Sequence, residues 1–130
     1  MSNNQNKVML IDDNFIDLKI NSKLIKITKI FNEIIICQSG EEALTYLKKH
    51  LKSPNLLPDY ILLDIQMPEM NGFEFLDQFK KLPKIITELC KVAMLSSTLD
   101  FGDIKRAEAN PYVIKLLKKP LSIEELKSIL

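Results

Sequence analysis

Residues 60–64 of this 130-residue chain are Tyr-Ile-Leu-Leu-Asp, a short apolar run that ends in an acid. Runs of the same kind occur at residues 8–11, 34–37 and 92–95, and a fifth, from Val113 to Leu117, is interrupted by Lys115. Short continuous apolar runs are typical of strands buried on both faces, as in a parallel sheet. The interrupted fifth run indicates a strand at the edge of that sheet.

Helical patterns separate the apolar runs. Helices are predicted from Phe15 to Phe31, from Gly40 to Leu51, from Gly72 to Leu82, from about Asp100 to Ala109, and from near Ser122 to Leu130. In the first of them the apolar residues at helical spacing are Ile16, Ile20, Leu24, Ile27 and Phe31. Helix starts are marked by the capping boxes Ser39–Glu42 and Ser122–Glu125, and more weakly by Asn14–Asp17, Asn71–Glu74 and Asp100–Asp103.

The order is therefore strand–helix, repeated five times. Such alternation predicts an α/β fold with a five-stranded parallel sheet covered on both faces, that is, a doubly wound (βα)5 chain. Right-handed crossovers favour the flavodoxin-like strand order 2-1-3-4-5. We expect a single domain over residues 1–130, with a flexible, polar N-terminal segment at residues 1–6.

The composition excludes several classes of function. The formal net charge of +1 gives no basic surface for nucleic acid, so we expect no nucleic-acid binding by this domain. No apolar run approaches the roughly 20 residues of a membrane span, and the N-terminus lacks the apolar core of a signal peptide. We therefore expect no membrane association and a cytoplasmic location, where Cys37 and Cys90 are buried free thiols.

Polar side chains follow the ends of the predicted strands. Asp12 and Asp13 come directly after the first strand, Asp64 ends the third, Ser96 ends the fourth, and Lys119 follows the fifth. The carboxyl ends of parallel strands share one edge of the sheet, where open α/β folds bind ligands. Converging carboxylates repel one another, and a hard divalent cation relieves that repulsion. Mg²⁺ suits best, since it accepts carboxylates and bridges to phosphate.

An aspartate beside Mg²⁺ can also be a nucleophile that forms an acyl phosphate. Phosphoryl transfer then requires mainly positioning and neutralisation of the phosphoryl oxygens, for which Lys119 offers a charge and Ser96 a hydroxyl. Ser97 and Thr98 are alternatives to Ser96, and Lys118 is an alternative to Lys119. Ser96 directly follows the apolar run, and Pro120 adjoins Lys119, which favours these two.

From about Lys7 to Leu130 the chain resembles the response-regulator receiver family. The matching segments are Ile11-Asp12-Asp13, the stretch from Leu63 to Gly72, Met94-Leu95-Ser96-Ser97-Thr98 and Lys119-Pro120. Each is weak alone, but their order and their places at strand ends make the combination specific.

The resemblance implies a role for each site residue. Asp64 would accept the phosphoryl group, Ser96 would contact it as the switch hydroxyl, and Lys119 would pair with its oxygens. Asp13 would ligate Mg²⁺ directly, Asp12 largely through water, Asp64 by its carboxylate and Gln66 by its backbone carbonyl. The Lys119-Pro120 bond is cis in family members, and an X-Pro bond makes that conformation accessible at about 1 kcal/mol.

The resemblance also implies partners. These would be a histidine kinase or phosphotransfer protein as donor, and a downstream protein bound by the face formed by the helix near 100–109, the strand near 113–117 and the helix from Ser122. Family members often carry Tyr or Phe three residues before the lysine, where this chain has Leu116, so the usual aromatic readout of the switch is absent.

Two other functions use the same residues. A Mg²⁺-dependent aspartyl phosphatase usually has Asp-x-Asp at its nucleophile, but Asp64-Ile65-Gln66 lacks the second acid. A pseudo-receiver that only binds partners would not need the complete set of acids, hydroxyl and lysine. The sequence therefore favours a phosphoacceptor signalling domain over an enzyme.

Overall fold

The computed structural model describes residues 6–98 and 100–130, so residues 1–5 of the expected flexible segment lie outside the described residues. One parallel sheet contains β1 (Lys7–Ile11), β2 (Glu33–Cys37), β3 (Tyr60–Asp64), β4 (Lys91–Ser96) and β5 (Val113–Lys118). The strand order is β2-β1-β3-β4-β5, with β5 at an edge. The predicted fold class and strand order are confirmed.

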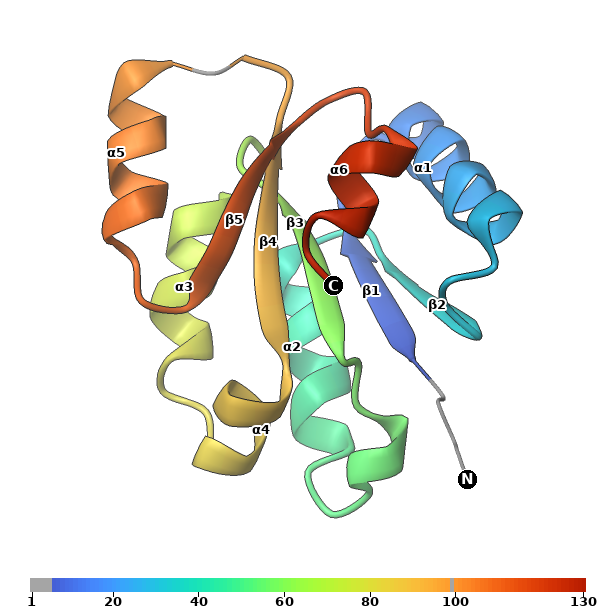
Figure 1. The fold of residues 1–130 in the computed structure, drawn as a ribbon. Coiled ribbons are helices and arrows are strands. Elements are labelled where there is room, and N and C mark those ends of the chain that lie inside the picture. Colours follow the sequence, from blue (N-terminus) through green and yellow to red (C-terminus); the bar gives the residue numbers. More distant parts are fainter. Residues whose placement is uncertain (1–5, 99) are drawn as a thin grey trace.

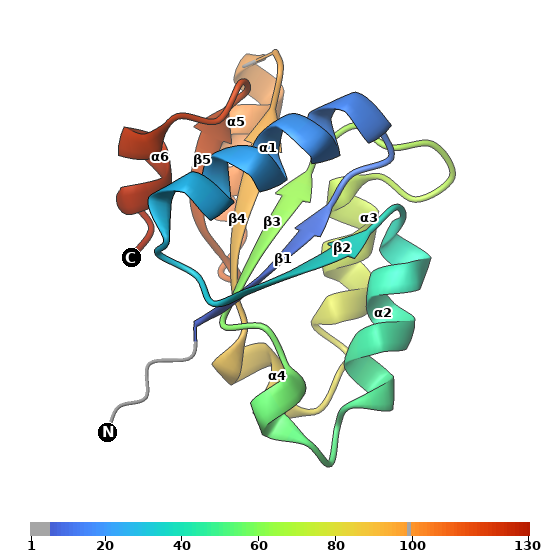
Figure 2. The same ribbon diagram turned by 90° about the vertical axis from the view of Figure 1, so that its right-hand side faces the viewer.

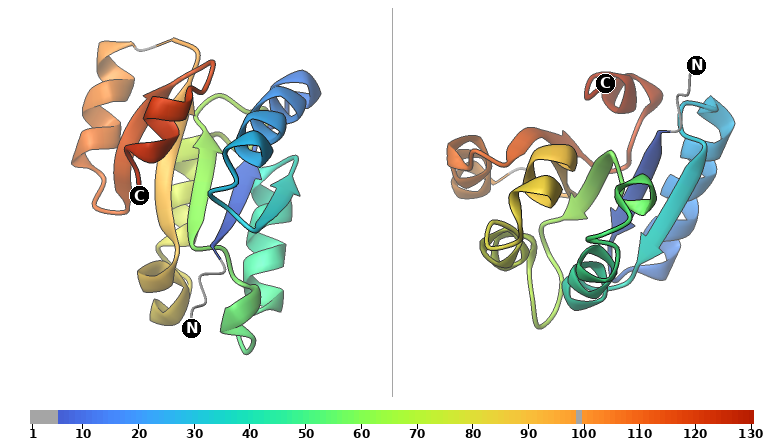
Figure 3. Two further views of the ribbon diagram at one scale, coloured as in Figure 1. Left: turned by 45° about the vertical axis from the view of Figure 1, so that its right-hand side comes forward. Right: turned by 90° about the horizontal axis from the view of Figure 1, so that it is seen from below.

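Helices lie on both faces of the sheet (Figures 1 and 2). Helices α1 (Phe15–Thr28) and α6 (Ile123–Lys127) cover one face, and α2 (Gly40–Lys49), α3 (Gly72–Phe79), α4 (Lys84–Leu89) and α5 (Phe101–Ala109) lie on the other. A short 3₁₀ helix spans Pro54–Leu56. The view from below in Figure 3 shows the sheet between these two layers. Within residues 6–98 and 100–130, none of the helices has the length and apolar content needed to cross a bilayer.

Alternate residues of β1 enter different cores. Val8 and Leu10 pack in the apolar cluster beneath α1 and α6, whereas Met9 and Ile11 pack in the larger cluster beneath α2 and α3. Side chains of a strand point alternately to opposite faces, so a strand covered on both sides must be apolar throughout. This arrangement explains the continuous apolar runs.

The predicted apolar stripe of the first helix is only partly correct: Leu24 packs against the core and Phe31 is buried in it, but the three isoleucines are not buried. Ile16, Ile20 and Ile27 are 66%, 53% and 66% exposed, and the helix buries Leu18, Asn21 and Ile25 instead. Asp17 shares the inward side of the helix and contacts Lys119. Turning the isoleucines inward would remove this contact and expose the buried Leu18, so the spacing predicted the helix correctly but placed Ile16, Ile20 and Ile27 wrongly. The helix also ends at Thr28, before Phe31, where Lys29 adopts a left-handed conformation with φ of 58°.

Helix α4 is not predicted from the sequence pattern. This helix follows Pro83 and has six residues, too few to show a helical period, and it buries Ile86. Because α4 is an additional element, the predicted helix near 100–109 is α5 and the predicted last helix is α6. Helices α2, α3 and α6 end at Lys49, Phe79 and Lys127, a few residues before their predicted ends.

The end of β3 is held against the start of α3. A Cβ atom on Gly72 would lie 2.7 Å from the Asp64 carbonyl oxygen and 2.8 Å from Cε of Met94, so only glycine fits this close approach. Asn71 and Glu74 form a complete capping box that begins α3 at this point. The loop that follows Asp64 is therefore tightly anchored on both sides.

Candidate functional site

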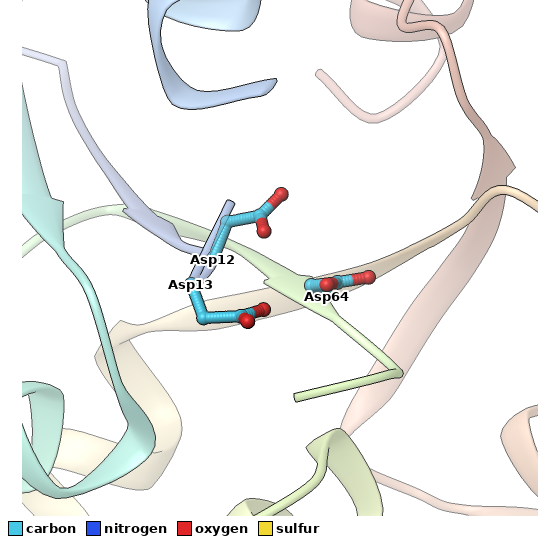
Figure 4. Close-up of side chains that lie close together, drawn as sticks. All are labelled: Asp12, Asp13 and Asp64. Carbon is cyan, nitrogen blue, oxygen red and sulfur yellow. The ribbon is translucent and has the colours of Figure 1, made fainter. Parts of the chain in front are cut away.

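Three carboxylates meet at the carboxyl end of the sheet (Figure 4). Asp12 and Asp13 follow β1 and Asp64 ends β3, and the pairing of Ile11 with Leu63 brings the two strand ends level. One ligand oxygen from each acid lies within 4.8 Å of the others. Asp12 and Asp64 are 3% and 5% exposed, whereas Asp13 is open to solvent. The structure thus brings together the three predicted acidic residues.

The electrostatics of the pocket favour an added positive charge. Burial and the neighbouring Asp12 carboxylate raise the pKa of Asp64 to about 6, against the lowering effect of Lys119 and of the Gln66 N–H. Hard carboxylate oxygens at this spacing are the ligands that Mg²⁺ accepts in proteins. The donor set therefore fits this ion.

Lys119 is the cation of the pocket. Its Nζ lies 2.8 Å from Asp12 Oδ2, 2.9 Å from Asp17 Oδ2 and 3.3 Å from Asp64 Oδ1. Burial lowers the pKa of Lys119, but hydrogen bonds to Asp12 and Asp17 and the charges of Asp64 and Asp12 outweigh it, so that pKa is raised overall. The ammonium is therefore a permanent charge at this site.

The backbone places Lys119 in the pocket rather than Lys118. The Lys119 N–H donates to the Ser96 carbonyl at 2.8 Å, and the Lys119-Pro120 peptide bond is cis, as the resemblance implies. Lys118 is exposed, and its N–H donates to Glu125 Oε2 at 3.1 Å. That contact also diverts the Glu125 side chain, so the predicted capping box at Ser122 is formed only by the Ser122 side chain.

Ser96 is 1% exposed at the end of β4, whereas Ser97 and Thr98 are exposed. The Ser96 hydroxyl donates to the Thr98 carbonyl and accepts from the Thr98 N–H at 3.2 Å. The hydroxyl is thus held by the loop that follows β4. Gln66 is also exposed, and its N–H approaches Asp64 Oδ1 at 3.4 Å, which places its backbone beside the acidic cluster.

Sequence reasoning missed Asp17. Its position three residues after Asn14 suggests a capping role, and the Asp17 N–H does donate to Asn14 Oδ1 at 3.0 Å. The Asp17 carboxylate, however, contacts Lys119 across 102 residues of sequence. An acid in the first turn of a helix that starts at the pocket was the available signal, because that turn lies beside the strand ends.

Comparison with known proteins agrees with this geometry. The family model of the response regulator receiver domain matches residues 8–130. The polar-differentiation response regulator DivK of Brucella anthropi is 30% identical over 129 residues, covering 95% of this chain and 94% of DivK. The solved structure of a two-component response regulator from Cytophaga hutchinsonii is 33% identical with a TM-score of 0.90, covering 98% of this chain and 95% of the other.

Longer proteins contain a similar segment. Histidine kinase CKI1 of Arabidopsis thaliana is 38% identical over 85 residues, but the match covers 60% of this chain and only 8% of the kinase. The family model, by contrast, spans nearly the whole of this chain. The chain belongs to the response regulator receiver family of two-component signalling.

Proposed function

We propose that this chain accepts a phosphoryl group on Asp64 in a Mg²⁺-dependent reaction and passes the signal to a protein partner by a change of conformation. Receiver domains act in two-component signalling and interact with histidine kinases. The observation that carries the proposal is the buried Asp64 carboxylate, which lies within 4.8 Å of two further acids and 3.3 Å from a lysine ammonium.

The reaction uses residues of this chain in separate roles. An Asp64 oxygen forms a bond to phosphorus while the phosphorus–nitrogen bond of a donor phosphohistidine breaks, and the departing imidazole takes a proton from solvent. Lys119 neutralises a phosphoryl oxygen, and Ser96 donates its hydroxyl to another. Mg²⁺ would be held by Asp13, Asp64 and the Gln66 carbonyl, and by Asp12 largely through water, and it would supply charge neutralisation.

The phosphoryl donor in this proposal is a histidine kinase or a phosphotransfer protein of the cytoplasm. The downstream partner is a protein that binds the face formed by α5, β5 and α6. Phe101, Ile114 and Ile123 on these elements are 71%, 45% and 39% exposed, which gives the face apolar side chains for a protein contact. The domain alone binds neither nucleic acid nor membrane, in keeping with its net charge of +1.

Labelling with acetyl phosphate tests this function against its two alternatives. In the presence of Mg²⁺ we expect one acid-labile phosphoryl group per chain, measured by intact-protein mass spectrometry, and no turnover of p-nitrophenyl phosphate. Repeated turnover of the phosphomonoester would instead identify an aspartyl phosphatase. A wild-type chain that takes up no label and does not bind beryllofluoride would be a pseudo-receiver.

Ser96 is expected to transmit the switch. A phosphoryl group on Asp64 adds up to two negative charges and strong hydrogen-bond acceptors, and it would draw the Ser96 hydroxyl away from Thr98. Both hydrogen bonds between that hydroxyl and the Thr98 backbone would then break. With beryllofluoride as the phosphoryl mimic, we expect the largest amide shifts at Asp64, at residues 96–98 and at residues 100–105. Leu116, which packs against the core, should move little.

The variant Ser96→Ala should still bind beryllofluoride but lose most of the shift changes at residues 100–105. Ser97→Ala is the matched control, since Ser97 is the neighbouring exposed hydroxyl, and it should respond like the wild type. A full response from Ser96→Ala, or shifts at Leu116 as large as those in the loop, would contradict this account of the switch.

A further inference from the structure

Asp17 is a third carboxylate partner of Lys119, and it stands apart from the acidic cluster. It comes from the first turn of α1, whereas Asp12, Asp13 and Asp64 come from strand ends. Its Oδ2 lies 2.9 Å from Lys119 Nζ, as close as the Asp12 oxygen at 2.8 Å. The Asp17 side chain is 35% exposed, against 4% for Asp12 and 7% for Asp64, so it is the most solvent-accessible of these three partners of Lys119.

The local structure frees the Asp17 carboxylate for this contact. In a capping box the third helical residue accepts a hydrogen bond from the N–H of the capping residue. In α1 the N–H of the capping residue, Asn14, donates to Asp12 Oδ1 at 2.9 Å instead. In α3, by contrast, Glu74 closes the box on Asn71 at 2.9 Å. The Asp17 carboxylate is therefore not engaged in a capping box, and it contacts Lys119.

We propose that Asp17 is a positioning residue that holds Lys119 on the α1 side of the pocket and sets the balance of affinity between a divalent cation and a phosphoryl anion. This inference rests on the proposed function. When Asp64 is ionised, three carboxylates contact the Lys119 ammonium and Asp13 lies in the same acidic cluster, so the pocket is negative overall. Each such charge attracts Mg²⁺ and repels an anion bound at Asp64, and Asp17 contributes to both effects without being a ligand of either.

The substitution Asp17→Asn separates charge from shape, because the amide oxygen can still accept a hydrogen bond from Lys119. We expect it to weaken Mg²⁺ binding by about three- to tenfold and, at saturating Mg²⁺, to tighten beryllofluoride binding by a similar factor. Both affinities are measured by titration, following the amide shifts of Asp13, Asp64 and Gln66. A purely structural defect would weaken both ligands together, so the opposite signs identify the charge effect.

Two further variants serve as controls. Asp77→Asn removes the same charge from another helix, where Asp77 pairs with Lys80 at 3.9 Å on the surface, and it should change either affinity by less than about twofold. Asp17→Glu keeps the charge and should return both affinities to near the wild-type values.

The outcomes separate this inference from the proposed function. If the wild type binds neither Mg²⁺ nor beryllofluoride, the proposed function fails and this inference fails with it. If the wild type binds both, but Asp17→Asn changes neither affinity or changes both in the same direction, the role of Asp17 is overturned while the proposed function stands.

Discussion

Asp64→Asn should reduce labelling by acetyl phosphate to the background level. Asn has nearly the shape of Asp, but its amide is not a nucleophile that can form an acyl phosphate. Asp64 also occupies the central position of the pocket, since it ends β3, is 5% exposed and lies 3.3 Å from Lys119 Nζ. The measurement is the fraction of chains that carry an acid-labile phosphoryl group after incubation with Mg²⁺ and acetyl phosphate.

Asp59 provides the control for this prediction. It directly precedes β3, at the opposite end of the same strand, and its Oδ2 accepts the Lys7 N–H at 2.8 Å. Asp59→Asn can keep that hydrogen bond and should be labelled like the wild type. If Asp64→Asn is labelled as fully as Asp59→Asn, the phosphoacceptor is another residue and the proposed reaction at Asp64 is excluded.

The strands and their order could be predicted because each strand has the same short apolar pattern and each is followed by a helix. A strand covered on both faces must be apolar throughout, and the helical crossovers between parallel strands cover both faces of the sheet. The face that a helix buries depends on its contacts with distant residues. In α1 the inward position of Leu18 and the contact of Asp17 with Lys119 leave Ile16 and Ile20 exposed, although their spacing alone suggests the opposite.

The same distinction applies to the site. Asp12, Asp13, Asp64 and Lys119 were predicted to converge because strand ends of one parallel sheet share an edge, and backbone position alone brings these residues together. The direction of a side chain is a different question. The hydrogen bond from the Ser96 hydroxyl to Thr98 does not follow from strand position, and neither does the contact between Asp17 and Lys119. Both interactions could be identified only from the structure.

Asp64→Asn should also make the metal-free protein more stable near neutral pH, although it removes the proposed phosphoacceptor. The folded wild type holds an ionised Asp64 in a buried position beside Asp12, which raises the pKa of Asp64 from 3.8 to about 6. Since one pKa unit corresponds to about 1.4 kcal/mol, we expect a gain of about 1–3 kcal/mol in the free energy of unfolding. The Asn side chain can still accept the hydrogen bond from the Gln66 N–H, so little is lost in exchange.

This gain in stability should depend on pH with a definite sign. A group whose pKa is higher in the folded state binds more protons there, so the wild type gains stability relative to Asp64→Asn as the pH falls. The difference between the two proteins should be largest above about pH 6, shrink as the pH falls through that value, and vanish below pH 3.8, where Asp64 is protonated in the unfolded chain as well. Urea unfolding in EDTA across this range measures the difference, and Asp59→Asn is again the control. A variant Asp64→Asn that is less stable than the wild type above pH 6 would contradict this prediction. It would mean that the attraction between Lys119 and the ionised Asp64 carboxylate exceeds the combined cost of burial and of repulsion by Asp12.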